Sequence, residues 1–196
     1  MMVEQRAEKN EIIYLEQDSA KTVYFVISGQ IKLFKMTKEG KEQIVRLACP
    51  GDSFGHTGIF NGGSNPESAQ AMIPSVLFKL AKNDLETLLW DHKLLALNTI
   101  RTMATEMHHY ISLIEDLSLR HVRDRLARLL LQYSSEGVFD KSLVLTQKDM
   151  ASMTGTVREV FGKSLKIFEE NGIVESNRHQ IIIKDMDTLK TMAGAA

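Results

Sequence analysis

The sequence predicts an α+β fold in three parts: an N-terminal antiparallel β-roll over residues 1–91, a long central dimerisation helix over residues 92–118, and a C-terminal winged helix-turn-helix over residues 119–196. Three observations predict this fold. Short β-rich runs alternate with glycine turns in the first part, an apolar heptad repeat crosses the second, and two short amphipathic helices joined at a glycine occupy the third.

The β-roll is predicted by the regular spacing of short runs, with no long helical pattern before about residue 82. The runs are residues 11–15, 22–28, 30–36, 42–48, 67–73 and 76–80. Residues 53–66 are rich in Gly, Ser and Asn, which indicates a functional loop or a short helix with a loop.

The central helix carries apolar residues that step by 3, 4, 3, 4 and 3 positions along the chain. These residues are Leu97, Ile100, Ala104, Met107, Ile111 and Ile114. The spacing is that of the a/d seam of a coiled coil, so two copies of the chain are expected to pair as a homodimer. The alternative is a helix that packs this stripe on its own β-roll. A hinge is expected at residues 118–120, followed by a helix at residues 121–133.

The segment that begins at residue 145 has the pattern of a helix-turn-helix. Thr146 is a good N-cap, and Asp149 three residues later completes an acidic capping box. Gly155 can adopt the positive φ that the turn needs, and Thr156 is predicted to cap the second helix and to contact DNA. A β-hairpin is predicted over residues 173–183, which makes the whole unit a winged helix.

The second helix of this motif has two chemically different faces. Its buried stripe is predicted at Phe161, Leu165 and Phe168. On the opposite face, Arg158 suits guanine, Glu159 suits cytosine, and Lys163 suits guanine or a phosphate. Gln147 and Lys148 of the first helix suit phosphate oxygens. Double-stranded DNA is therefore the expected partner; the alternative is an amphipathic helix pair with a solvated charged face.

Composition fits a soluble globular protein, with 43% hydrophobic residues, 25% charged residues and a net charge of −1. Residues 1–118 carry 12 Lys and Arg against 15 Asp and Glu, and residues 119–196 carry 12 against 10, so the positive excess lies in the C-terminal part. No apolar stretch approaches the roughly 20 residues that span a bilayer, and no signal peptide opens the chain. We expect a cytoplasmic protein with no membrane partner.

Four phrases carry a family resemblance: residues 26–33, 50–55, 122–127 and 155–159. With the order of the parts, they make the chain similar to the bacterial regulators that include the catabolite activator protein and the fumarate–nitrate regulator. The resemblance implies a cyclic-nucleotide-binding-like roll, sequence-specific promoter binding, contact with RNA polymerase, and control by an effector. By position, Arg158, Glu159 and Lys163 match the family's base-contacting residues. Lys163 stands where one branch has an arginine, and it cannot form the guanidinium fork.

The candidate effector pocket departs from the cyclic-nucleotide members of that family. Those members have a glutamate after Phe-Gly for the ribose and an arginine before Ser-Ala for the phosphate. The matching positions here are His56, followed by Thr57, and Glu67, followed by Ser68. A carboxylate repels a cyclic phosphate, and no replacement cation is evident nearby in the sequence. These residues argue against cyclic AMP or cyclic GMP.

Three hypotheses for the effector stay open, and its identity is unknown from the sequence. One is a small organic molecule, aromatic or anionic. Another is haem, sensing carbon monoxide or nitric oxide, with His56 as the candidate ligand and His108, His109 or Cys49 as the second. The last is no ligand at all. The alternative for His56 is a partly exposed loop histidine, and for the histidine pair a solvated helix face. No other metal site is predicted, and Cys49 alone excludes an iron–sulfur cluster.

Enzymatic activity is not expected. His56 with Glu67 or Asp52 could be an acid–base pair, but no nucleophile motif, phosphate loop or metal spacing accompanies them. A roll protein that only mediates protein contacts is a third class. The charge pattern at the start of the second helix argues against that class.

Overall fold

The computed structural model describes residues 2–135, 138–139, 145–177 and 180–194. It contains two compact units. The first comprises Met1–Met36 and Ile44–Ile111, and the second comprises Thr37–Gln43 and Ser112–Ala196. The division falls within the long helix α3 (Lys93–Leu119). The predicted division into three parts, with this helix as a part of its own, stays a prediction.

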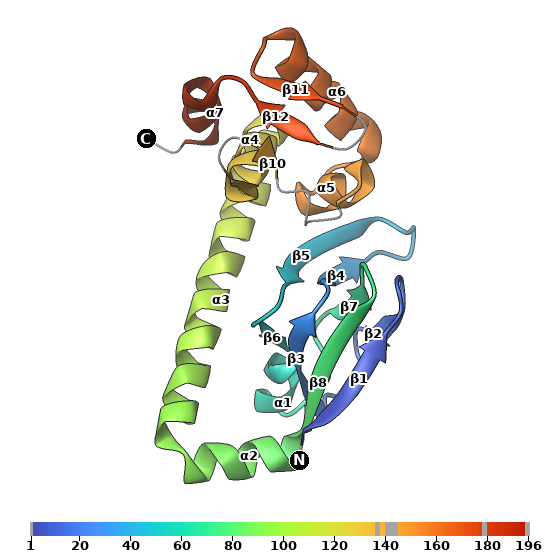
Figure 1. Ribbon diagram of the computed structural model, residues 1–196, viewed down its shortest axis with the longest axis vertical. Helices are drawn as coiled ribbons and strands as arrows, with labels where there is room; N and C mark the ends of the chain where they lie inside the picture. Colours follow the sequence, from blue (N-terminus) through green and yellow to red (C-terminus); the bar gives the residue numbers. More distant parts are fainter. Residues whose placement is uncertain (1, 136–137, 140–144, 178–179, 195–196) are drawn as a thin grey trace. The chain divides into compact units, whose positions relative to one another are not determined.

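The first unit is the predicted β-roll, built from two four-stranded sheets (Figure 1). One sheet has the strand order β1–β8–β3–β6, and the other has the order β2–β7–β4–β5. The strands are β1 (Val3–Ala7), β2 (Ile12–Tyr14), β3 (Thr22–Ser28), β4 (Ile31–Met36), β5 (Glu42–Ala48), β6 (Ser53–Phe54), β7 (Ser68–Ala71) and β8 (Ser75–Ala81). A short helix, α1 (His56–Phe60), follows β6, and α2 (Lys82–Asp91) follows β8.

Side chains from both sheets of the roll meet in one apolar core. Leu33 of β4 and Leu77 of β8 are almost completely buried, as is Phe54 of β6. The Phe54 ring stacks on Tyr24 of β3 with 5.1 Å between centroids, and the ring of Tyr14, on β2 of the other sheet, lies 6.0 Å away. Each such burial contributes roughly 1.5–3 kcal/mol to folding. This core fixes the loop between β6 and β7, which holds the candidate pocket residues.

The predicted central helix is confirmed as α3, one continuous helix of 27 residues (Figure 1). At 1.5 Å per residue it is about 40 Å long. It ends at the predicted hinge, where Arg120 and His121 separate it from α4 (Val122–Gln132). Among the helices of the described residues, none combines the length and the apolar character needed to cross a bilayer.

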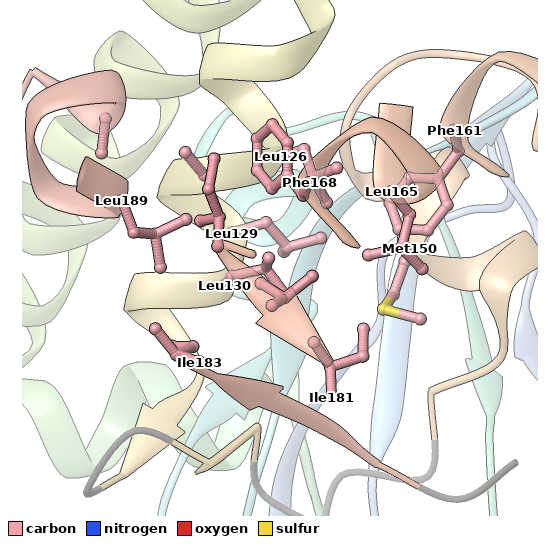
Figure 2. Packing of buried hydrophobic residues seen from close by; sticks show 14 of the residues in the cluster. Leu126, Leu129, Leu130, Met150, Phe161, Leu165, Phe168, Ile181, Ile183 and Leu189 are labelled. Carbon is pink, nitrogen blue, oxygen red and sulfur yellow. The ribbon is translucent and has the colours of Figure 1, made fainter. Parts of the chain in front are cut away.

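The second unit is a winged helix. Its elements are the end of α3, α4, β9 (Ser134–Ser135), β10 (Val138–Phe139), α5 (Gln147–Met153), α6 (Arg158–Glu170), β11 (Val174–Ser176), β12 (Ile181–Ile183) and α7 (Met186–Ala193). The strands form one sheet in the order β11–β12–β10–β9. Figure 2 shows how Leu126 and Leu130 of α4, Phe168 of α6, Ile181 of β12 and Leu189 of α7 converge on a single core.

The helix-turn-helix consists of α5 and α6. The predicted capping box is confirmed: the Thr146 hydroxyl accepts from the Asp149 N–H at 3.1 Å, and the Asp149 carboxylate accepts from the Thr146 N–H at 2.9 Å. Gly155 has the predicted positive φ of 66°. The prediction that Thr156 caps the second helix was wrong. Val157 is the N-cap in extended conformation, and no side chain caps this end, because α6 begins one residue later than the hydroxyl would require.

Several short elements were absent from the sequence-based prediction. They are β1, β6, β9, β10 and α7. Helix α7 has a clear signal in retrospect, because Asp185 caps it by accepting from the Thr188 N–H at 2.9 Å. The predicted hairpin is confirmed as β11 and β12, while residues 178–179 of the predicted range lie outside the described residues.

Candidate functional site

The first candidate site is the charged face at the start of α6. Arg158, Glu159 and Lys163 are all exposed, and so are Gln147 and Lys148 at the start of α5. Phe161, Leu165 and Phe168 are buried, as predicted, on the opposite side. The buried stripe anchors the helix in the core of the second unit, so the charged face is turned outward. Thr156 is only half exposed, in the turn between the two helices.

Two valines interleave the charges of this face. Val157 is 49% exposed and Val160 is 40% exposed, which is unusual for β-branched apolar side chains. In a major groove, apolar side chains can contact the methyl group of thymine, and an arginine can donate two hydrogen bonds to guanine. Exposed Arg158, Glu159 and Lys163 beside two exposed valines therefore offer both kinds of contact to base edges.

Arginines just before and within α4 have a structural role that the sequence did not reveal. Arg120 and Arg128 both pair with Asp116 near the end of α3, at 3.1 Å and 3.3 Å. Arg125 donates to the Leu117 carbonyl at 3.3 Å, so it also binds the end of α3. Arg123, by contrast, is exposed. These arginines fix the α3–α4 junction at the predicted hinge.

The predicted seam of α3 is exposed within the single chain. Ile100 is 62% exposed, Met107 58%, Ile111 54% and Ile114 63%, and Leu97 is 42% exposed. Ala104 is also exposed. The alternative prediction, that this stripe packs on the roll of the same chain, was therefore wrong. Exposed apolar patches of this kind are typical of surfaces that contact other proteins.

The second candidate site is the pocket region of the first unit, where His56 is not the partly exposed loop histidine of the alternative prediction. It begins α1 and is 95% buried, with 5% exposure. Its Nε2 lies 2.8 Å from Oε2 of Glu106, on α3. Since an ionised carboxylate only accepts, Nε2 carries the hydrogen and donates it.

Glu106 also binds a second partner from the roll. Arg46 of β5 donates from Nη1 to Glu106 Oε1 at 2.6 Å, and from Nη2 to the Ser53 carbonyl at 2.7 Å. Burial alone would raise the pKa of Glu106, but the hydrogen bond from His56 and the charge of Arg46 outweigh it, and the pKa is lowered. We call Arg46, His56 and Glu106 the buried ion-pair cluster.

Glu67 and two tyrosines lie around this cluster. Glu67 is buried, and burial raises its pKa, with the Glu106 charge adding to the rise and the Arg46 charge opposing it. Arg46 therefore corrects the prediction that no cation lies near Glu67, although its guanidinium is already paired. Burial likewise raises the pKa of Tyr110 to about 12, and it also raises the pKa of Tyr14. The Tyr14 hydroxyl has no hydrogen-bond partner among the described residues.

The other predicted pocket residues have separate roles. Ser68 uses its hydroxyl to accept from the Glu16 N–H at 2.9 Å, and Thr57 is half exposed on α1. His108 is exposed as predicted, but His109 is not solvated, because its Nε2 lies 2.8 Å from the Val45 carbonyl.

Haem ligation by His56 does not fit this arrangement, because Glu106 occupies the nitrogen that would bind iron. Cys49 is half-buried, within 3.9 Å of the Gln30 amide nitrogen. In the part of the chain that the structure describes, no group of three or more His, Cys, Asp or Glu is placed to hold a metal ion.

Arg46 and Glu106 were missed by sequence reasoning, and each left a signal. Arg46 is a charged residue within a strand of mostly apolar residues, Ile44, Val45 and Leu47. Glu106 interrupts a second stripe of α3, at helical spacing between Met103 and Tyr110. The a/d seam is the more regular of the two apolar patterns on this helix, so the second stripe is harder to recognise in the sequence.

Comparisons with known proteins agree with both units. Residues 4–92 match the cyclic nucleotide-binding domain, and residues 124–192 match the Crp-like helix-turn-helix domain. The chain is 29% identical to Electron transport regulator A of Shewanella oneidensis, over 96% of this chain and 78% of the relative. It is 24% identical to the CRP-like cAMP-activated global transcriptional regulator of Mycobacterium tuberculosis, over 94% and 85%. The structure of FixK2 from Bradyrhizobium japonicum superposes with a TM-score of 0.87 at 25% identity, covering 100% of this chain and 99% of that one.

These matches cover a roll domain and a helix-turn-helix domain in the same order, along nearly the whole chain. The relatives so matched are transcription regulators and not enzymes. The chain therefore belongs to the CRP/FNR family of transcription regulators, and its second unit is the helix-turn-helix DNA-binding domain of that family.

Proposed function

We propose that this regulator acts in the cytoplasm as a homodimer that binds a palindromic promoter site and contacts RNA polymerase there, under a control other than cyclic AMP. The single observation that carries the proposal is the outward face of α6. Arg158, Glu159 and Lys163 are exposed there while the opposite stripe is fully buried. A helix held in this way can enter a major groove without rearranging its own core.

The dimer is supported by the uncovered seam of α3. Ile100, Met107, Ile111 and Ile114 are each more than half exposed, at the a/d spacing of a coiled coil. A two-fold dimer presents two copies of α6, and a two-fold pair of reading helices requires a site with the same symmetry. The palindrome thus follows from the dimer.

Independence from cyclic AMP is supported by the pocket. Glu67 occupies the position that the phosphate-binding arginine has in cyclic-nucleotide members, and its charge would repel a phosphate. His56 occupies the position of the ribose-binding glutamate, and it already binds Glu106. One relative is named as cAMP-activated, and this chain lacks the residue pair that would give it the same ligand.

The test begins with selection of bound duplexes from a random DNA library, followed by fluorescence anisotropy on the recovered site. Arg158→Ala should weaken binding by roughly 1–3 kcal/mol and relax the preference at one base pair of each half-site. Lys190→Ala on α7, which removes one positive charge away from α6, is the control and should bind nearly as the wild type does. An unchanged base preference in Arg158→Ala would remove this residue from the base contacts.

A further inference from the structure

We propose that the buried ion-pair cluster of Arg46, His56 and Glu106 ties α3 to the β-roll, so that the protein binds DNA without a small-molecule effector. The inference rests on the proposed function and concerns how that function is controlled. It selects the hypothesis of no ligand from the three that the sequence left open.

The first argument is where burial occurs on α3. Of the 27 residues of this helix, only Glu106 is buried, at 8% exposure. A helix that packs on its own domain normally buries apolar side chains, whose contacts are not directional. Here the fully buried group is a carboxylate, which is unfavourable in an apolar interior unless charged partners satisfy it. The position of α3 on the roll therefore depends on the partners of Glu106.

The second argument is that both partners are fixed to the roll. Arg46 lies on β5, and its Nη2 donates a second hydrogen bond to the Ser53 carbonyl at 2.7 Å. His56 is the first residue of α1, separated by one residue from β6, whose Phe54 is buried in the core of the roll. Along the same helix, His109 adds a polar contact to the Val45 carbonyl of β5 at 2.8 Å. Val45 and Arg46, consecutive residues of β5, thus bind His109 and Glu106 of α3. These directional contacts favour a single position of α3 on the roll.

The third argument is the place of the cluster. His56 and Glu67 stand at the two positions where cyclic-nucleotide members of the family hold their ligand. In this chain His56 binds the Glu106 carboxylate of α3. The charges of Arg46 and Glu106 both act on the pKa of Glu67. A contact between roll and helix that is made by the chain's own residues needs no ligand to favour one state of the helix.

The first experiment compares native protein with protein that has been unfolded in denaturant, dialysed and refolded, which removes bound small molecules. Both samples are titrated into the selected duplex by fluorescence anisotropy. We expect the same Kd for both. Refolded protein that regains its circular dichroism spectrum but loses binding would overturn the proposal, and would point to a hydrogen-bonding ligand held by the unpaired Tyr14 hydroxyl. Native protein that binds no duplex at all would instead contradict the proposed function.

The second experiment separates a regulatory tie from a merely structural ion pair. It compares Glu106→Gln, Arg46→Met and the double variant, with Glu86→Gln as the control, because Glu86 is an exposed glutamate of α2 in a surface pair with Lys82. Each single variant leaves one buried charge without its partner and should lower the Tm. The double variant leaves neither charge and should regain much of that stability.

DNA affinity should behave differently from stability in this series. We expect a loss of about tenfold or more in the double variant, because the tie is gone although the fold is restored. The Glu86→Gln control should bind as the wild type does. A double variant that regains stability and also binds DNA like the wild type would show that the cluster is only structural. If the double variant does not fold, the refolding comparison decides the question alone.

Discussion

At the scale of single residues, the pocket region is organised by charge balance. Glu67 and Glu106 are two buried carboxylates within the electrostatic influence of the Arg46 guanidinium. Glu106 receives both an ion pair with this guanidinium and the His56 hydrogen bond, and together they lower its pKa despite burial. Glu67 makes no such ion pair within the described part of the chain, and burial raises its pKa above the ordinary value. The two acids therefore depend on pH in opposite directions.

For Glu67 the dependence predicts lower stability at higher pH. A carboxyl whose pKa is raised by folding contributes stability that is complete below its ordinary pKa and is lost as the pH rises through the raised pKa. Glu67→Gln, which cannot ionise, should therefore gain stability relative to the wild type as the pH rises from the ordinary to the raised pKa, and the difference should level off above the raised pKa. Urea denaturation at a series of pH values measures it. A constant difference at every pH would contradict the assignment.

Haem offers a further prediction at this scale. Because Glu106 engages Nε2 of His56, protein purified from haem-supplemented cells should show no Soret band at stoichiometric intensity. Absorption spectroscopy of the wild type and of His56→Ala measures this directly. A strong Soret band in the wild type that His56→Ala abolishes would mean that the histidine leaves Glu106 to bind iron.

The chemistry of the DNA face was predictable from the sequence at the residue scale, and that of the pocket was not. Arg158, Glu159 and Lys163 are close together in the chain, so helical spacing alone places them on one side. His56 and Glu106 are 50 positions apart and meet only because the roll and α3 fold together. A burial pattern can flag Glu106 as unusual, but no local pattern names its partners.

At the scale of elements, α5 depends on its capping box. Thr146→Ala removes the hydroxyl that accepts from the Asp149 N–H, and it should lower the free energy of unfolding by about 1 kcal/mol. Thr102→Ala on the exposed face of α3 is a suitable control, since alanine has the higher helix propensity and nothing is lost. Urea denaturation of the three proteins measures the difference. Equal destabilisation by both substitutions would mean that the cap contributes nothing of its own.

The seam of α3 gives a second prediction for an element. A lysine at two a/d positions, Ile100→Lys with Ile111→Lys, would place four charges in the core of a coiled coil and should give a monomer. Leu15→Lys replaces an apolar residue that is 52% exposed on the roll, and it should leave the association unchanged. Sedimentation equilibrium gives the mass of each variant. A double variant that stays dimeric would place the dimer contact elsewhere.

The elements also show where local pattern suffices. Strand β3, strand β5 and helix α3 were predicted within one residue of their observed ends, because turn glycines flank the two strands and a helical stripe marks α3. The edge strand β1 has mostly exposed side chains and lacks an apolar run of this kind. Strands of two residues, such as β6, exist only through their pairing with a partner strand. Tertiary pairing, not propensity, makes these short elements.

At the scale of the whole molecule, the chain forms two units with separate cores, and helix α3 runs from the first into the second. The first carries the buried ion-pair cluster, and the second carries the exposed charged face of α6. The junction of α3 with α4 is fixed by Asp116, which pairs with both Arg120 and Arg128. We expect a change at the cluster to alter DNA affinity by way of this helix, as the variants of Arg46 and Glu106 will show.

The measurement that tests the central claim most directly is selection of duplexes by the full-length wild-type protein from a random DNA library, with sequencing of the bound pool. The proposal predicts enrichment of a palindrome whose half-sites lie about 10 base pairs apart, one turn of the duplex. It also predicts that Arg158→Ala recovers the same spacing with one base of each half-site relaxed. Enrichment of no sequence, or of a single unpaired half-site, would contradict sequence-specific binding by a homodimer.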